Sequence, residues 1–316
     1  MQSIVKSITK GIRRTAILSV AVLAAVSILV NIGYVIAQAN QNTYRSPQEA
    51  VMAVVSAIRD DDTNQLVRIF GPESKEILQS GDDVADKQTR EKFLEKYQEM
   101  NRLVANPGGS VTLYLGAENW PFPIPLVKRN GTWRFATAAG KREILYRRIG
   151  RNEFDTIDTL HALVDAQKEY ASLPRDGESK HYAQKLMSDK GKHNGLYWKT
   201  GEGEPTSPVG PLIADAFNEG YRKKEGATPF HGYIYRLLQS QGPNAPGGAM
   251  NYLVNGELTR GFAFIAYPVE YRNSGVMTFI VNQDGKIYQK DLGPNTEKVA
   301  SSITAYNPDQ TWQIAE

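Results

Sequence analysis

Residues 230–293 constrain the fold of this chain more than any other stretch, because they alternate β-rich runs with turn-forming residues. Aromatic and β-branched residues dominate the runs, and Gly, Pro, Asn and Asp separate them, which is the pattern of consecutive strands. The predicted strands are 233–238, 250–254, 261–267 and 276–281, with a further one at 286–290.

The strand at 261–267 is apolar on both faces. Its side chains alternate between the two sides of the sheet, with Phe262, Phe264 and Ala266 on one side and Ala263, Ile265 and Tyr267 on the other. A strand of this kind is central in its sheet and needs a cover on each face. We expect a helix at 152–172 to supply one cover. The other cover is the C-terminal segment 296–306, the irregular connection 173–228 or the first domain.

The helix is predicted from residues 141–172, which contain no proline. Ile157, Leu160 and Val164 recur at helical spacing and mark the buried face. Gly150 is the point where the helix would kink or divide. We therefore predict a second domain at 141–316, made of a long helix, an irregular connection and an antiparallel β block.

A first domain is predicted at 44–140. Ser46, Pro47 and Glu49 form a helix start, with a capping serine, a proline in the first turn and a glutamate that closes a capping box. Asn130 and Gly131 form the turn of a hairpin. We expect helices near 47–58, 63–70 and 86–101, a strand at 111–115 and the hairpin at 127–135.

The N-terminal residues 1–39 have the pattern of a targeting segment. Four basic residues precede a long apolar run at 16–36, and Ala37-Gln38-Ala39 resembles a cleavage site. The segment is either a signal peptide or an uncleaved membrane anchor, since the run is about long enough to span a bilayer. Both alternatives place the remainder outside the cytoplasm, in the periplasm or cell envelope, with membrane contact only if the segment stays attached.

Composition excludes several classes of function. The net charge is +3, but removing the four basic residues of the first 39 from the total of 37 leaves 33 basic against 34 acidic residues. A nucleic-acid partner is not expected, since it usually requires a clustered basic face. The chain has no cysteine, which excludes disulfides, thiolate metal sites and cysteine acylation.

No catalytic, cofactor-binding or metal-binding residue can be assigned from motifs. The four histidines show no paired metal spacing, and no phosphate-binding loop or nucleophile elbow occurs. The acids Glu257, Glu270 and Asp291 could pair across the sheet, as carboxylate hydrolases require. The candidate interaction surface lies in and beside the β block and consists of His231, Tyr233, Tyr235, Tyr267, Glu270 and Tyr271.

Several phrases resemble a bacterial family known only as domain of unknown function 2950. They are "IGRNEFDTIDTL", "HGYIYRLLQSQGPNAPGGA", "GFAFIAYPVEY" and "SGVMTFIVNQDGKIYQKDLG". The similarity runs from about Ser46 to the C-terminus. The resemblance implies an exported protein and assigns no functional residue.

Two weaker resemblances concern the folds of the halves. The second half is similar to the globular domain of type IV pilins, through Asn152, Glu153, Ile157, Leu160, Ala166, Gln167 and Tyr170. The first half resembles the nuclear-transport-factor-2-like cone fold, with helices followed by a curved sheet. The expected class is therefore α+β, with a cone-like domain followed by a pilin-like helix and sheet.

The function expected from these features is that of a non-catalytic binding or scaffolding protein of the cell envelope. Its partner would be an unidentified envelope protein or polymer. One alternative is an envelope hydrolase that uses carboxylates near His231. A second alternative is a pilin-like structural subunit.

Overall fold

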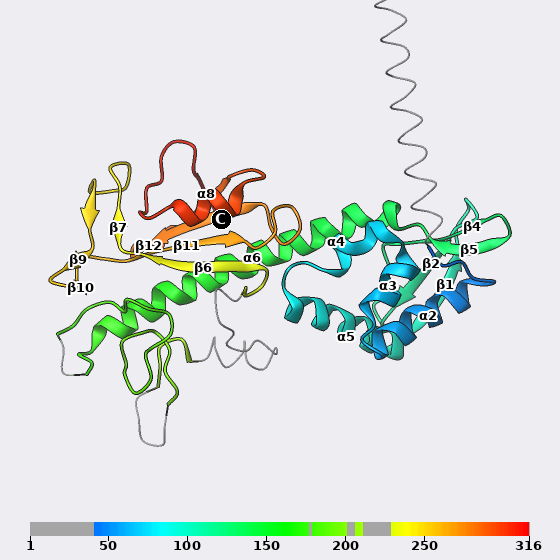
Figure 1. The fold of residues 1–316 in the computed structure, drawn as a ribbon, viewed down its shortest axis with the longest axis horizontal. Coiled ribbons are helices and arrows are strands. Elements are labelled where there is room, and N and C mark those ends of the chain that lie inside the picture. The colour runs from blue at the N-terminus through cyan, green and yellow to red at the C-terminus, as the bar shows by residue number, and fades with distance from the viewer. Residues whose placement is uncertain (1–40, 177–178, 201–205, 211–228, 316) are drawn as a thin grey trace, which may run out of the picture. The chain divides into compact units, whose positions relative to one another are not determined.

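The computed structural model describes residues 41–176, 179–200, 206–210 and 229–315 (Figure 1). The predicted targeting segment and most of the irregular connection after 200 lie outside these ranges. Within the described ranges, no helix combines the length and apolarity needed to cross a membrane.

The chain divides into two compact units. Unit 1 consists of Met1–Lys75 and Met100–Ala139, and unit 2 consists of Glu76–Glu99 and Gly140–Glu316. The helical segment 76–99, which the sequence analysis included in the first domain, thus groups with unit 2. Independent folding of each unit stays a prediction.

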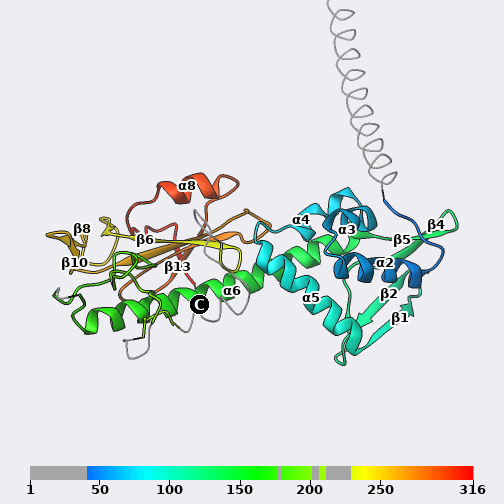
Figure 2. The same ribbon diagram turned by 60° about the horizontal axis from the view of Figure 1, so that its bottom comes forward.

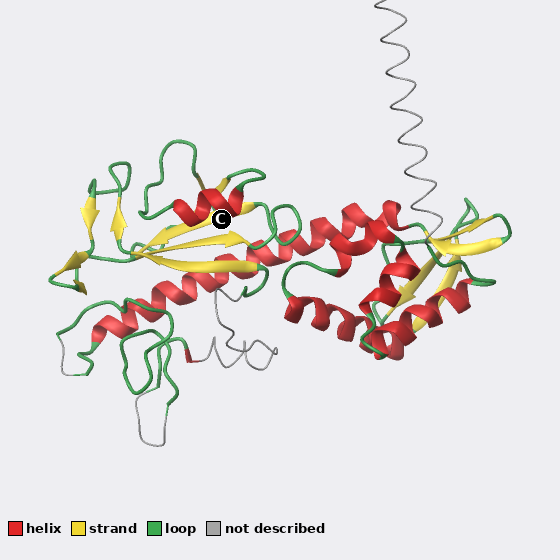
Figure 3. Ribbon diagram, viewed as in Figure 1, coloured by secondary structure: helices red, strands yellow, loops and turns green. Residues whose placement is uncertain are grey.

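Unit 1 packs helices on an antiparallel sheet (Figure 3). The helices contribute Val51, Val54, Leu66 and Ile69 to the buried apolar residues of this unit, and the sheet contributes Leu113, Leu115 and Leu126. The strand order is β1-β2-β4-β5, with β3 paired to β2. Its elements are α2 (Pro47–Arg59), α3 (Thr63–Phe70), η1 (Pro72–Ser74), β1 (Asn101–Ala105), β2 (Val111–Leu115), β3 (Trp120–Pro121), β4 (Leu126–Arg129) and β5 (Thr132–Phe135).

Local sequence signals explain where these elements begin. Ser46 Oγ accepts the Glu49 N–H at 3.1 Å, and Glu49 Oε2 accepts the Arg45 N–H at 2.8 Å, so the capping box closes one residue earlier than in the standard motif. Asn130 and Gly131 have φ of 50° and 83°, as a type I′ hairpin turn requires.

Unit 2 contains the sheet that the β-rich segment predicts. Its strands are antiparallel in the order β14-β13-β12-β11-β6. All six residues of β11 are buried, which confirms the prediction of a strand covered on both faces. The strands are β6 (Tyr233–Leu238), β11 (Ala263–Pro268), β12 (Met277–Asn282), β13 (Tyr288–Asp291) and β14 (Gln313–Ile314).

The strand predicted at 250–254 is divided in the structure. β8 (Met250–Asn251) pairs with β7 (Ser240–Gln241), whereas β9 (Leu253–Val254) pairs with β10 (Glu257–Leu258). Tyr252, between the two, is fully buried, and its hydroxyl donates to Gln241 Oε1 at 2.7 Å. Burial of this side chain separates the two hairpins.

The two faces of the main sheet have different covers (Figure 2). On one face, Leu160 and Val164 of α6 (Thr137–Ser172) join Phe262, Phe264 and Phe279 in one core. On the other face, Ala300 of α8 (Thr296–Ser302) joins Ile265 in a second core. The C-terminal segment therefore supplies the second cover, and the α+β class with a long helix on an antiparallel sheet is confirmed.

Helix α6 is continuous across Gly150. A Cβ placed on Gly150 would meet no heavy atom within 4 Å, so neither packing nor a close approach explains this glycine. Unit 2 also includes α5 (Asp83–Glu99) and the end of α4 (Lys75–Leu78). Asp86 is the buried residue of α5, whereas the larger apolar side chains of this helix, Phe93, Leu94 and Tyr97, are only half-buried.

Candidate functional site

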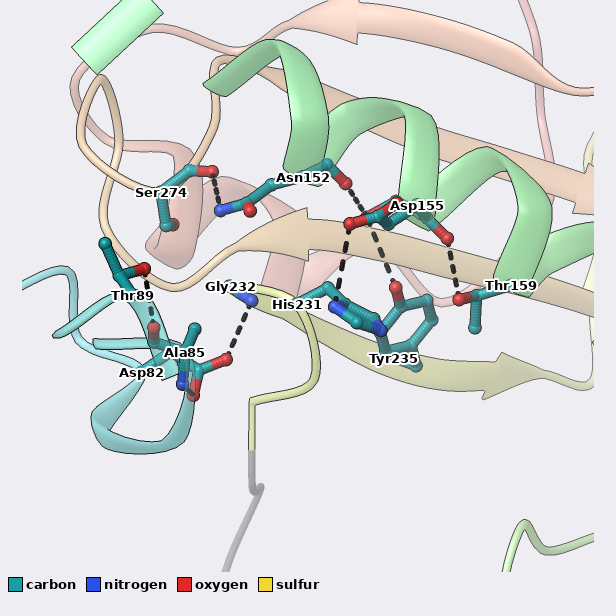
Figure 4. Close-up of polar contacts among 11 residues, drawn as sticks. Asp82, Ala85, Thr89, Asn152, Asp155, Thr159, His231, Gly232, Tyr235 and Ser274 are labelled. Atoms are coloured by element: carbon teal, nitrogen blue, oxygen red, sulfur yellow. Dashed lines mark hydrogen bonds and ion pairs between the residues drawn. The ribbon is translucent and has the colours of Figure 1, made fainter. Parts of the chain in front are cut away.

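Four segments of unit 2 that are distant in the sequence meet at one polar junction (Figure 4). They are the loop between α4 and α5, the middle of α6, the turn before β6, and the loop between β11 and β12. The polar junction consists of Asp82, Asp86, Arg148, Asn152, Glu153, Asp155, His231, Gly232, Tyr235, Asn273 and Ser274.

The turn before β6 is a tight hairpin turn at the edge of the sheet. Phe230 N–H donates to Tyr233 O at 2.9 Å, and Tyr233 N–H donates to Phe230 O at 3.1 Å. The central residues His231 and Gly232 have φ of 49° and 74°, as in a type I′ turn. A Cβ at position 232 would lie 2.6 Å from Asn152 Nδ2, so this position also requires glycine for space.

The Asp82 carboxylate binds main-chain donors from two segments. Oδ2 accepts the Gly232 N–H at 3.0 Å. Oδ1 accepts the N–H groups of Val84 and Ala85 at 3.2 and 3.1 Å, which caps the start of α5. Asp82 is only 1% exposed. The carboxylate oxygens are therefore shielded from solvent, and they fix the main chain of the turn before β6 and of the first turn of α5.

A second buried acid lies one helical turn further along α5. Asp86 Oδ2 accepts the Ser80 N–H at 2.8 Å. Burial raises the pKa of Asp86, while the hydrogen bonds from Ser80 and the charges of Arg148 and Arg90 act in the opposite direction. Asp86 is thus a carboxyl group whose ionisation is opposed mainly by loss of water.

Arg148 of α6 joins the α4 region to the β11–β12 loop. Its Nη1 donates to Glu76 O at 2.8 Å and to Asn273 Oδ1 at 2.6 Å, and its Nη2 donates to Ile77 O. Burial lowers the pKa of Arg148, and the nearby Asp86 raises it. Asn273 completes the link by donating from Nδ2 to Gln79 O at 2.9 Å.

Two further residues of α6 hold the start of β12. Asn152 Nδ2 donates to Ser274 O at 2.8 Å. Glu153 Oε1 accepts the N–H groups of Val276 and Met277 at 2.9 and 3.0 Å. Both side chains satisfy main-chain groups at the point where the β11–β12 loop enters the sheet.

His231 and Asp155 are the pair in the junction that most resembles catalytic machinery. His231 Nδ1 and Asp155 Oδ2 are 3.6 Å apart, and the histidine side chain is 24% exposed. This distance is too long for a hydrogen bond. The Phe230 and His231 rings lie against each other with centroids 4.0 Å apart. Beside them, the Tyr235 hydroxyl donates to Thr156 Oγ1 at 3.2 Å, and burial raises the pKa of Tyr235.

The structure separates the six residues of the predicted interaction surface. His231 and Tyr235 lie in the junction. Tyr233 and Tyr267 are 0% and 7% exposed and belong to the cores on opposite faces of the sheet. Glu270 is exposed and accepts from Asn273 Nδ2 at 2.6 Å.

The remaining predicted acids and aromatics have separate structural roles. The Tyr271 hydroxyl donates to Asp291 Oδ2 at 3.1 Å. Glu257 accepts from Ser179 Oγ at 2.9 Å on the β9–β10 hairpin. Among the residues that the structure describes, no group of three or more His, Asp or Glu side chains is arranged to hold a metal ion.

The residues that build the junction carry no recognisable motif in the sequence. Asp86 and Arg148 lie in polar helical segments and Asp82 lies in a polar loop, and charged side chains in such segments are usually solvated. The one local signal is at Asp82, an N-cap residue type directly before a helical stretch. The hydrogen-bond partners of Asp82 and Arg148 that lie 71 to 150 residues away follow only from the tertiary fold.

Comparisons with known proteins give a family and no further relatives. Searches of curated proteins and of solved structures found no significant match to the chain. A family model described as "Protein of unknown function (DUF2950)" matches residues 41–315. Since this match covers nearly all of the sequence, the chain belongs to the DUF2950 family.

Proposed function

We propose that this chain is an exported envelope protein that serves as a non-catalytic binding or scaffolding module. The observation that supports this proposal is the use of the carboxylates in the polar junction. Asp82 and Glu153 accept hydrogen bonds from main-chain N–H groups. Carboxylates bound in this way fix the positions of segments and are poor groups for proton transfer.

The proposed binding surface lies on α6 next to the junction. Phe154 and Tyr146 are 67% and 65% exposed, and large exposed aromatic side chains are common anchors of protein interfaces. Phe154 directly precedes Asp155, the acid that faces His231. The exposed Glu270 lies on the loop that α6 holds through Arg148 and Asn273. The partner would be another envelope protein or an envelope polymer.

Site-specific photo-crosslinking in intact cells tests this surface. A photoreactive amino acid at Phe154 should capture one defined partner, whereas the same group at His161, which is exposed on the same helix, should not. Equal capture at both positions, or none at Phe154, would argue against the surface. N-terminal sequencing of the same protein from the envelope fraction tests export, which predicts a start near Asn40 for a cleaved signal peptide.

A hydrolase remains the alternative because the His231–Asp155 pair is partly exposed. The purified chain would then cleave an envelope polymer, and Asp155→Asn would abolish cleavage without lowering the melting temperature. Such a result would replace the non-catalytic proposal. A pilin-like structural role is the further alternative supported by the packing of α6 on the sheet, and it predicts regular self-association of the full chain.

A further inference from the structure

We propose that a pocket in unit 1 binds a phosphate group, carried by the headgroup of an anionic phospholipid. The pocket has a volume of ≈ 410 Å³ and, among described residues, is lined by Thr43, Arg129, Asn130, Thr132 and Arg134. Arg129, Thr132 and Arg134 belong to the β4–β5 hairpin, whose strands are labelled in Figure 1. The pocket shares no residue with the polar junction, and the proposal stands independently of the function suggested for unit 2.

The strand register brings the lining residues together. Arg129 pairs with Thr132, and Arg134 pairs with Val127, so Arg129, Thr132 and Arg134 project from one face of the hairpin. Leu126 and Phe135 project from the other face and are buried in the core.

The entering chain completes the pocket. Tyr44 forms a bridge with Trp133 through hydrogen bonds of 2.8 and 2.7 Å. Trp133 lies on the core-facing side of the hairpin, opposite Arg134, because neighbouring residues of a strand alternate. Tyr44, its bridge partner, shares that side and is buried, so Thr43, which precedes it, lies on the same side as Arg134. The pocket therefore follows from the register of the hairpin and of the segment beside it.

The chemistry of the lining favours a phosphate. Two guanidinium groups, one amide and two hydroxyls are present, and no carboxylate occurs among the described lining residues. Arginine binds phosphate oxygens through paired, charge-assisted hydrogen bonds. The Thr132 hydroxyl donates to Arg129 O at 3.2 Å, so the Thr43 hydroxyl and the Asn130 amide are the groups that can donate to the remaining oxygens.

The position of the pocket in the sequence favours a lipid as the carrier. The apolar run predicted as a signal or anchor ends at Ile36, seven residues before Thr43. Seven residues span at most about 25 Å when fully extended. If the apolar run stays in a bilayer, Thr43 and the two arginines lie within reach of its surface, where their positive charges attract the phosphate of an anionic headgroup.

Calorimetric titration of the full chain in neutral detergent micelles tests the site. The ligands are dihexanoyl phosphatidylglycerol, dihexanoyl phosphatidylcholine and inorganic phosphate, each added separately. We expect saturable binding of phosphatidylglycerol that Arg129→Gln/Arg134→Gln weakens by at least about tenfold, as loss of hydrogen bonds to a charged group predicts. Phosphatidylcholine should bind more weakly because its choline group offsets the phosphate charge.

The matched control is Arg59→Gln/Lys128→Gln. It removes the same charge from unit 1, and Lys128 lies on the opposite face of the same hairpin. The control should bind phosphatidylglycerol as the unchanged protein does. Should the double arginine variant melt at a lower temperature, Arg129→Gln alone, at an exposed position, carries the test.

Each outcome decides one part of the proposal. Equal binding by both double variants, or no saturable binding of any ligand, overturns the site. Binding of inorganic phosphate without binding of phosphatidylglycerol overturns the lipid as carrier. Binding of phosphatidylglycerol that is lost only in the arginine variants supports both the site and the carrier.

Discussion

The main-chain N–H of Gly232 donates to Asp82 Oδ2 at 3.0 Å across 150 residues of sequence. This bond joins the turn before β6 to the loop that begins α5. The same carboxylate caps α5 through Val84 and Ala85. One buried side chain thus couples a helix start to the edge of the sheet, and the segment 76–99 belongs to unit 2 in part for this reason.

Asp82→Ala should destabilise unit 2 by about 1–3 kcal/mol, because it leaves buried main-chain donors without an acceptor and removes a helix cap. Hydrogen exchange should increase at Gly232 and in the first turn of α5. The matched control is Asp83→Ala, at the exposed neighbouring position. Similar exchange in both variants would contradict the role given to Asp82.

Two glycines of unit 2 should respond in opposite directions to alanine. At Gly232 the φ is positive, at 74°, and an added Cβ would lie 2.6 Å from Asn152 and 2.9 Å from Ser274. Gly232→Ala should therefore cost at least about 1–3 kcal/mol. At Gly150 the Cβ meets open space inside a helix, so Gly150→Ala should stabilise by about 0.5–1 kcal/mol. Thermal melts of the two variants measure both signs.

Asp86 should make stability fall as pH rises over a defined range. Burial raises the pKa of this carboxyl in the folded chain, so the folded state binds its proton more tightly than the unfolded state does. The contribution to stability is then greatest below the unfolded pKa of about 4. It declines as pH rises from that value through the raised folded pKa.

Urea unfolding of Asp86→Asn and of the unchanged protein between pH 3.5 and about 7 measures this effect. The unfolding free energy of the variant should rise relative to that of the unchanged protein across the range, because Asn does not ionise. Asp83→Asn, at an exposed site on the same helix, should show no such trend. A constant difference between Asp86→Asn and the unchanged protein would contradict the raised pKa.

The fold was predictable where side-chain patterns are local. The alternation in 261–267 predicts a doubly covered central strand, and Asn130-Gly131 predicts its hairpin turn, because each depends on neighbours in the sequence. The strand β1 was missed, since none of its residues is buried and its sequence therefore lacks a clear inward face.

The polar junction was not predictable, because its bonds join residues far apart in the chain. Arg148 donates to Asn273 across 125 residues, and its sequence context is that of a solvated basic cluster. The aromatic residues around His231 and Tyr235 in the sequence place both in the candidate interaction surface. Their partners on α6, Asp155 and Thr156, depend on the rotation of that helix against the sheet, which the apolar stripe fixes only approximately.

The packing of α6 on the sheet should depend most on Leu160. This side chain is 0% exposed and lies in the core with Phe264 and Phe279. Leu160→Ala should cost about 2–5 kcal/mol because it leaves a cavity. Leu160→Asp should cost more, since an unpaired carboxylate is buried in addition.

Thermal and urea unfolding of the full chain measure both effects, with Asp158→Ala as the control. Asp158 is exposed on the same helix, so its loss should change stability by less than about 0.5 kcal/mol. The full chain is the appropriate protein, because a fragment starting at 141 would lack segment 76–99. That segment is bonded to the rest of unit 2 through Arg148, which donates to Glu76 O, and through Asp82, which accepts the Gly232 N–H. If Leu160→Asp unfolds at the same urea concentration as the unchanged protein, α6 does not use this face to cover β11. The proposed pilin-like arrangement of helix and sheet would then lose its physical basis.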